Sequence, residues 1–395
     1  MEIQTLNTGI KVPPLRAEGA GIYIHIPFCK QACHYCDFHF STNLEKKTTM
    51  LAALQEELKI RKQEFAGELI HTIYFGGGTP SVLEIDEIDQ ILTTIQDHYK
   101  VSENPEITLE ANPDDLSKEK LAQLASSAIN RLSIGIQSFF EADLTFMNRA
   151  HNASEAQECI QWASKFFDNI SIDLIYGLPN MTRERWLQNV EKALSFNVPH
   201  ISSYALTVEP KTALAHFIKK GVVKPLDDAM AEEHFHLLVH TLEQSGYIHY
   251  EISNFGKPGY FSQNNTAYWL GKKYMGIGPS AHSFDGKQRS WNINNNAKYL
   301  ASLSDGVLPK KVERLSKTDR YNEYVMTGLR TIWGVSLHQI LKEFGQDYQK
   351  YLLEQAERHL GQDLLQIVED KLFITKKGKF LSDGIASDLF MVKFN

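Results

Sequence analysis

The sequence has few cysteines, no long apolar run and no excess of positive charge. Four cysteines among 395 residues are too few for the disulfide framework of a small secreted protein. Lys and Arg number 41 against 48 Asp and Glu, a net charge of -7, and no dense basic block is present, so we expect no nucleic-acid partner. No run of about 18 apolar residues could span a bilayer, and the N-terminus, which carries Glu2, has no continuous apolar segment. These absences predict a cytoplasmic protein without a transmembrane segment.

The composition is that of a folded, globular protein. With 43% hydrophobic and 23% charged residues the chain can bury a large core, which excludes a disordered or fibrous protein. Its length predicts roughly two or three folded units, or fewer if one of them is a large parallel barrel.

One rhythm repeats from Gly21 to about Pro210: a short apolar run rich in β-formers, a polar turn, and a longer stretch with helical spacing. The six apolar runs are Gly21 to Ile26, Leu69 to Phe75, Glu106 to Glu110, Arg131 to Gln137, Ile170 to Tyr176 and His200 to Leu206. Alternating strands and helices predict an α/β fold with a parallel sheet and right-handed crossovers. Six units in place of eight predict a partial, TIM-like (β/α)6 barrel with an open side.

The rest of the chain follows other patterns. Residues 211–305 contain a helical segment and an aromatic, Asn-rich and Gly-rich stretch that we expect to close or line the barrel mouth. A charged link is expected near residues 310–320, followed by helices and then a hairpin around Glu369 and Asp370, a pattern typical of a small winged-helix-like module. The predicted units are therefore an N-terminal extension at 1–20, the partial barrel at 21–210, the closing segment at 211–305 and a C-terminal α+β module at 306–395.

Three cysteines follow the first predicted strand with the spacing C-x3-C-x2-C: Cys29, Cys33 and Cys36. Three thiolates from so short a loop suit an iron-sulfur cube, which normally takes four cysteines, so that one iron would stay open. A Cys3His zinc site is the alternative, completed by one of His25, His34 and His39. A redox pair of Cys33 and Cys36 would leave Cys29 without a role.

Other polar or glycine residues also lie on or after the predicted strands, where the carboxyl ends of parallel strands form the working rim of a barrel. The GGGTP segment from Gly76 to Pro80 would let backbone groups approach a ligand closely, although such a turn is often only structural. Five polar side chains also belong to this rim. Each of them alone could simply be hydrogen-bonded within the fold, but their common position favours a ligand site. They are Tyr23, Glu110, Gln137, Arg149 and Asp173.

The cysteine loop, with aromatic Tyr35 directly before its last cysteine, resembles the radical SAM superfamily. The resemblance implies a 4Fe-4S cluster whose open iron is chelated by S-adenosylmethionine, and one electron from the cluster would then split the sulfonium. Tyr35 would pack on the adenine. The glycine segment resembles the motif that holds the methionyl amino group.

Five phrases together, YIHIPFC, GGGTPS, LEANP, RLSIGIQSF and DLIYGLP, resemble the oxygen-independent coproporphyrinogen III oxidase group, which includes the HemN decarboxylases and the HemW heme chaperones. The resemblance extends to the C-terminal module, which would be of the HemN type. Position by position, it implies S-adenosylmethionine contacts for Tyr23, Gly77, Gly78, Thr79 and Glu110. Gln137, Arg149 and Asp173 match residues that line a second cofactor molecule in the decarboxylases.

Two features favour the heme chaperone branch over the decarboxylases. Phe38 stands where the decarboxylases have a further cysteine, and the chain lacks their longer N-terminal extension. The chaperone motif H-N-x-x-Y-W, proposed to serve heme, is present here without its histidine, as Asn264, Asn265, Tyr268 and Trp269. Since an amide ligates iron poorly, His282 is a substitute candidate, although a packed or hydrogen-bonded histidine is the simpler interpretation of that residue.

The resemblance therefore implies a protein that binds a 4Fe-4S cluster, S-adenosylmethionine and heme and passes heme to an acceptor such as a respiratory enzyme. The alternatives are an oxygen-independent porphyrinogen decarboxylase and a zinc-stabilised barrel without redox chemistry.

Overall fold

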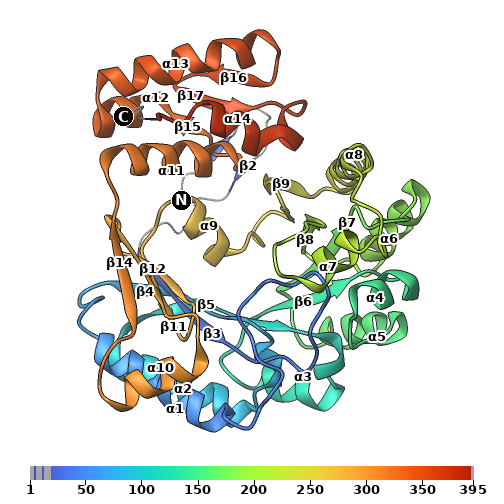
Figure 1. Ribbon diagram of the computed structural model, residues 1–395, viewed down its shortest axis with the longest axis vertical. Helices are drawn as coiled ribbons and strands as arrows, with labels where there is room; N and C mark the ends of the chain where they lie inside the picture. Colours follow the sequence, from blue (N-terminus) through green and yellow to red (C-terminus); the bar gives the residue numbers. More distant parts are fainter. Residues whose placement is uncertain (1–3, 6–10, 13–18, 393–395) are drawn as a thin grey trace.

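The computed structural model describes residues 4–5, 11–12 and 19–392 (Figure 1). Its main sheet has 12 strands in this part of the chain, in the order β14-β13-β12-β11-β3-β4-β5-β6-β7-β8-β10-β9. The six predicted strands are confirmed as consecutive parallel neighbours: β3 (Ala20–Ile26), β4 (Leu69–Gly77), β5 (Lys100–Ala111), β6 (Arg131–Gln137), β7 (Ile170–Tyr176) and β8 (His200–Ala205). The α/β barrel-like fold class is therefore confirmed.

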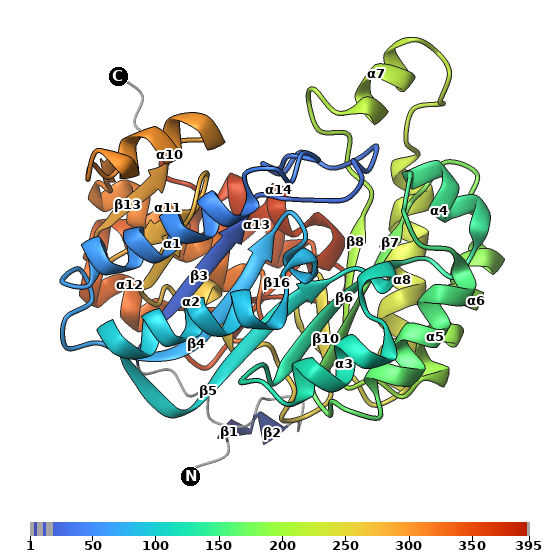
Figure 2. The same cartoon turned by 90° about the horizontal axis from the view of Figure 1, so that it is seen from below.

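Helices between these strands lie on the outer side of the curved sheet, and Figure 2 shows α1, α2 and α3 across it. They are α1 (Lys47–Arg61), α2 (Ile85–His98), α3 (Lys118–Ala125), α4 (Glu141–Met147), α5 (Ala153–Ala163) and α6 (Arg183–Ser195). In α2, Glu84 and Glu87 form a capping box, and Ile88, Ile91 and Ile95 make a buried stripe at helical spacing. This stripe packs into the main hydrophobic core together with the isoleucines of β3.

Residues beyond β8 extend the sheet at both edges. After α7 (Ala213–Lys219) and α8 (Asp228–Gln244), the strands β9 (Ile248–Glu251) and β10 (Asn254–Gly256) join the edge next to β8. The chain then crosses through α9 (Gln263–Trp269), on the inner side of the sheet, to the other edge (Figure 1). There it forms β11 (Tyr274–Ile277), β12 (His282–Phe284) and β13 (Gln288–Asn292), and α10 (Asn296–Ser304) follows. The strand β11 is parallel to β3, its neighbour in the sheet.

The charged stretch expected as a link near residues 310–320 is instead a strand and the start of a helix. The strand β14 (Lys310–Arg314) pairs with β13, and α11 (Lys317–Leu329) begins three residues later. The prediction was wrong because four of the five residues of β14 are exposed. This edge strand therefore lacks the alternation of apolar and polar residues from which a strand is predicted.

The C-terminal part has a hydrophobic core of its own, which includes Tyr321, Val325, Ile340, Leu352 and Leu372. It comprises α11, α12 (Leu337–Phe344), α13 (Gln346–Gly361), α14 (Ser382–Asp388) and a three-stranded sheet of β15 (Val335–Ser336), β17 (Lys371–Ile374) and β16 (Leu365–Val368). The predicted hairpin around Glu369 and Asp370 is confirmed.

The N-terminal extension is largely outside the described residues, apart from the paired strands β1 (Gln4–Thr5) and β2 (Lys11–Val12). Among the described residues, no helix is both long enough and apolar enough to cross a bilayer.

Candidate functional site

The three cysteines of the first loop line one end of a cavity of about 640 Å³ at the carboxyl ends of the barrel strands, the barrel cavity. The loop is held by backbone hydrogen bonds on both sides. The Cys29 amide donates to the carbonyl of Ser41 at 3.1 Å, and the Thr79 amide donates to the carbonyl of Phe28 at 2.7 Å. The cysteine loop and the glycine turn after β4 therefore form one wall of the cavity.

Two of the thiols lie in an environment that opposes their ionisation unless a cationic centre is present. Burial raises the pKa of Cys29 to about 12 and that of Cys36 to about 11, and the neighbouring cysteines raise both further. Thr79 Oγ1 donates a hydrogen bond to Cys29 Sγ at 3.2 Å, and Arg149 Nη1 donates to Cys33 Sγ at 3.4 Å. Three neighbouring sulfurs, two of which already accept hydrogen bonds, fit the donor set of an iron-sulfur cluster, because iron deprotonates the thiols it binds.

The three nearby histidines are engaged elsewhere. His25 Nε2 bonds the carbonyl of His39 at 2.9 Å, His34 Nδ1 bonds the carbonyl of Phe146 at 2.9 Å, and His39 Nε2 bonds Asn296 Oδ1 at 2.6 Å. Among the described residues, no group of three His, Cys, Asp or Glu side chains forms a site for a metal ion. Because a ligating histidine ordinarily hydrogen-bonds through its second ring nitrogen, the contacts of His34 and His39 do not separate a Cys3His zinc site from an iron-sulfur cluster.

Close packing requires glycine in the turn after β4, and the same turn lines the barrel cavity. A Cβ at Gly78 would lie 2.5 Å from the carbonyl oxygen of Phe28, and Gly77 has φ of 108°, a conformation that favours glycine. Gly77, Gly78 and Thr79 all line the barrel cavity. Because the two glycines carry no side chain, their backbone groups are open to a bound ligand.

Two carboxyl groups line the cavity and have raised pKa values. Burial raises the pKa of Glu110 to about 7, and the charge of Asp173 adds to this effect. A 2.7 Å hydrogen bond from Tyr74 acts in the opposite direction. Burial, opposed by the charges of Arg131 and Arg149, raises the pKa of Asp173 to about 6. An ammonium or sulfonium ligand would restore the ionised form of both groups, so this region of the cavity suits a cationic ligand.

Arg149 links the predicted residues to one another. Its Nη2 donates to Asn112 Oδ1 at 2.7 Å and to the carbonyl of Gly135 at 2.8 Å, while its Nη1 lies 3.5 Å from the hydroxyl of Tyr35. Gln137, at φ of 66°, also lines the cavity. Asn112, which directly follows β5, also lines the cavity; its place two residues after Glu110 marks it in the sequence, although we predicted no ligand contact for it.

Tyr23 lies apart from these residues. It does not line the barrel cavity, and its ring stacks on Tyr74 with 6.0 Å between centroids. Burial raises the pKa of Tyr23, and the nearby Glu110 and Tyr268 raise it further. Arg131 is a second interior residue that sequence reasoning missed: it is 2% exposed, and its Nε lies 3.9 Å from Glu106 Oε2.

The motif around Asn264 forms α9, and the first residues of this helix are hydrogen-bonded to a side chain of the barrel interior. Both oxygens of Glu106 accept amide hydrogens of α9, from Gln263 and Asn264, each at 3.1 Å. Asn264 itself is 3% exposed, and its Oδ1 accepts a hydrogen bond from Thr72 at 3.2 Å. The position of the missing histidine therefore faces the inside of the barrel.

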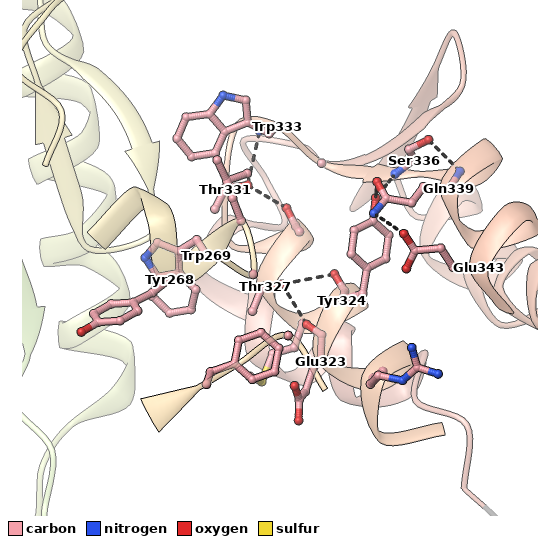
Figure 3. A pocket seen from close by; sticks show the side chains of 18 of the residues that line it. Tyr268, Trp269, Glu323, Tyr324, Thr327, Thr331, Trp333, Ser336, Gln339 and Glu343 are labelled. Carbon is pink, nitrogen blue, oxygen red and sulfur yellow. Dashed lines mark hydrogen bonds between the residues drawn. The ribbon is translucent and has the colours of Figure 1, made fainter. Parts of the chain in front are cut away.

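The other heme candidates do not all line one cavity. Tyr268 and Trp269 line a second cavity of about 610 Å³, the interdomain cavity, between the barrel and α11 (Figure 3). Asn265 and His282 line neither cavity. The exposed His282 stacks on Trp291 with 5.9 Å between ring centroids.

Comparisons with known proteins agree with this architecture. The model of the radical SAM superfamily matches residues 23–193, and the model of the HemN C-terminal domain matches residues 315–381. The solved structure of coproporphyrinogen III oxidase (HemN) from Escherichia coli, described as a radical SAM enzyme, superposes with a TM-score of 0.82 at 23% identity, covering 95% of this chain and 91% of that chain. This likeness shows the shared fold.

Two relatives extend the similarity over nearly the whole length. The heme chaperone HemW of Lactococcus lactis is 35% identical over 94% of this chain and 98% of its own length. The heme chaperone HemW of Bacillus subtilis is 32% identical over 92% of this chain and 97% of its own length. This chain belongs to the radical SAM superfamily and, within it, to the HemW group of proteins with a HemN C-terminal domain.

Proposed function

We propose that this protein is a heme chaperone, which binds a 4Fe-4S cluster and S-adenosylmethionine in the barrel cavity, binds heme, and delivers heme to an acceptor protein such as a respiratory enzyme. Membership of the radical SAM superfamily implies the cluster and S-adenosylmethionine. The observation that carries the rest is the similarity, over 94% of the chain, to a relative named for heme chaperone activity.

In this proposal the residues of the barrel cavity have three tasks. Cys29, Cys33 and Cys36 supply thiolates to three irons, and the fourth iron is left to S-adenosylmethionine. Glu110 and the backbone of Gly77 hold the charged and polar groups of that ligand, with Gly78, Thr79 and Tyr35 beside them. Arg149 keeps the cysteine loop and Asn112 in place through the hydrogen bonds described above.

Oxygen-independent porphyrinogen decarboxylation is the second candidate. Gln137, Arg149 and Asp173, which match the second-cofactor residues of the decarboxylases, line the barrel cavity together. Phe38 speaks against it: it is 67% exposed beside this cavity, at the position where the decarboxylases have a cysteine.

One paired experiment separates the two candidates. The protein is first reconstituted anaerobically with iron and sulfide. One portion is titrated with heme, and the heme-loaded protein is then mixed with a heme-free respiratory acceptor. A second portion is given coproporphyrinogen III, S-adenosylmethionine and a reductant. A heme chaperone gives a Soret change and transfers heme, and it releases no carbon dioxide from coproporphyrinogen. Decarboxylation without any Soret change would contradict the proposal and favour the enzyme.

A further inference from the structure

The interdomain cavity has the shape and walls of a site for a flat aromatic ligand. Its volume of about 610 Å³ is within the roughly 300–1,000 Å³ of ligand pockets. Trp269 of α9 lies on one side, with the ring of Tyr268 directed away from α11, and Glu323, Tyr324 and Thr327 of α11 lie on the other (Figure 3). Further aromatic rings complete the lining: Tyr274, Phe284, Trp333 and Phe344. Aromatic faces on both sides favour a planar π-system between them.

The charges of this cavity favour a ligand with carboxylates. Arg289, Arg320 and Lys371 line it, against the acids Glu323 and Glu343. The Arg289 guanidinium pairs with Glu323 at 2.9 Å. No ion pair with a described residue is found for Arg320 or Lys371, which leaves two cations for the acidic groups of a ligand.

The cavity offers little to an iron atom. None of its described lining residues is a histidine or a cysteine. Tyr324 donates its hydroxyl hydrogen to Gln339 at 3.0 Å and accepts one from the Ser336 amide at 3.1 Å. The Tyr268 hydroxyl points away from α11, and burial raises the pKa of this phenol, so a phenolate is unfavourable (Figure 3). The thioether of Met326 remains, but methionine serves heme iron together with a histidine.

We infer that the interdomain cavity binds a dicarboxylate porphyrin by its flat face and its carboxylates, through Trp269 and Arg320, and contributes no ligand to the iron. This inference rests on the proposed heme function and specifies its binding site. Release of the heme then breaks no bond between the iron and this protein, so an acceptor protein that ligates the iron can capture the heme as it leaves the cavity. The inward-facing Asn264 is consistent with this arrangement, since no histidine is needed at that position.

The test compares heme with metal-free protoporphyrin IX on the full-length protein, using absorbance for heme and fluorescence for the metal-free ring. We expect the two dissociation constants to agree within about threefold, because the recognised groups are the same. Arg320→Ala should raise both constants about tenfold, since one charge-assisted contact is lost. Trp269→Ala should raise both by about tenfold or more, whereas Trp269→Phe, which keeps a flat face, should recover most of the affinity.

Arg314→Ala is the matched control, because Arg314 is an exposed arginine on β14 that lines neither cavity. It should leave both dissociation constants unchanged. Heme that binds the wild-type protein about 100-fold more tightly than the metal-free ring would overturn the inference alone, and so would unchanged affinities in the Arg320 and Trp269 variants. Wild-type protein that binds neither porphyrin would overturn the proposed heme function together with the inference.

Discussion

The barrel cavity and the interdomain cavity are similar in volume but are built in different ways. The barrel cavity is lined by three cysteines of the loop after β3 and by residues at the carboxyl ends of the next strands, such as Gly77 of β4, Glu110 of β5 and Asp173 of β7. The interdomain cavity combines α9, β11 and β12 with α11 and α12 of the C-terminal part. The lining of the first contains three thiols and more acids than bases, whereas the lining of the second contains no thiol and more bases than acids. The two proposed sites, one for a redox cofactor and one for a flat cargo, have no lining residue in common among those described.

Cys33→Ala tests whether the two cavities are independent, and its effect should be the largest. Loss of one of three thiolates should abolish the cluster, while the chain stays folded and porphyrin affinity changes by less than about twofold. Iron and sulfide per chain, circular dichroism and porphyrin titration measure the three quantities. Cys159→Ala is the control, because Cys159 is a buried thiol on α5 that lines neither cavity, and it should keep the cluster. Global unfolding of Cys33→Ala would point to a purely structural metal.

Glu106→Ala should damage the interdomain cavity and spare the barrel cavity. The carboxylate holds two amides of α9 and lies beside the buried Arg131, so its removal leaves a buried cation and two donors without a partner. We expect a loss of about 3 kcal/mol in the free energy of unfolding, measured by urea denaturation, with weakened porphyrin binding and unchanged iron content. Glu106→Gln, which keeps one acceptor oxygen, should lose less. An equal fall in iron content would show that the cavities are not independent.

The carboxyl groups of the barrel cavity should make the stability of the cofactor-free protein depend on pH. Because the pKa values of Glu110 and Asp173 rise to about 7 and about 6 on folding, the folded chain binds more protons than the unfolded chain below neutral pH. The free energy of unfolding should therefore fall as the pH rises from about 4.5 to about 7, by about 2 kcal/mol after allowance for partial exposure.

Glu110→Gln should flatten this decline, since the amide does not titrate but still accepts the hydrogen bond from Tyr74. Urea denaturation at several pH values measures the slope for both proteins. A slope as steep in the variant as in the wild type would contradict the assignment of the effect to Glu110.

Arg330 lines the barrel cavity and also stacks on Trp269 of the interdomain cavity. Its replacement should have the smallest effect. Its guanidinium lies 5.0 Å from the ring centroid of Trp269, and the same side chain lines the barrel cavity. Arg330→Lys keeps the charge but loses the planar stack, so porphyrin affinity should fall about threefold with stability within about 1 kcal/mol of wild type. Arg183→Lys, which alters an exposed pair with Glu233, should change neither. A larger change in iron content than in porphyrin affinity would assign Arg330 to the barrel cavity alone.

Much of the barrel was predictable because its signals are local. Each strand reads as an apolar run, and parallel strands bring their carboxyl ends to one rim, so the sequence alone places the cysteines, glycines and strand-terminal polar residues together. Tyr23 shows the limit of this reasoning. It lies on the same strand as the cysteine loop, but the alternation of side chains along β3 directs it into the barrel interior against Tyr74.

The interdomain cavity was not predictable. Trp269 and Arg320 are 51 residues apart, and no periodicity connects them. Both line this cavity because Glu106 anchors α9 inside the barrel and because α11, which belongs to a separate core, lies across the cavity from α9. The same anchoring turns Asn264 inward, which the motif itself does not reveal.

The order of residues along this chain by itself determined the α/β class, the six parallel strands and the cysteine triad, since each depends on spacing within one unit or one loop. Only the tertiary structure decided which polar groups face a cavity, where β11 joins the sheet, and that two distant segments enclose a second cavity. The physical reason is that burial and long-range packing depend on contacts between residues far apart in the chain. The spacing of residues within one segment does not indicate which distant segment it will contact.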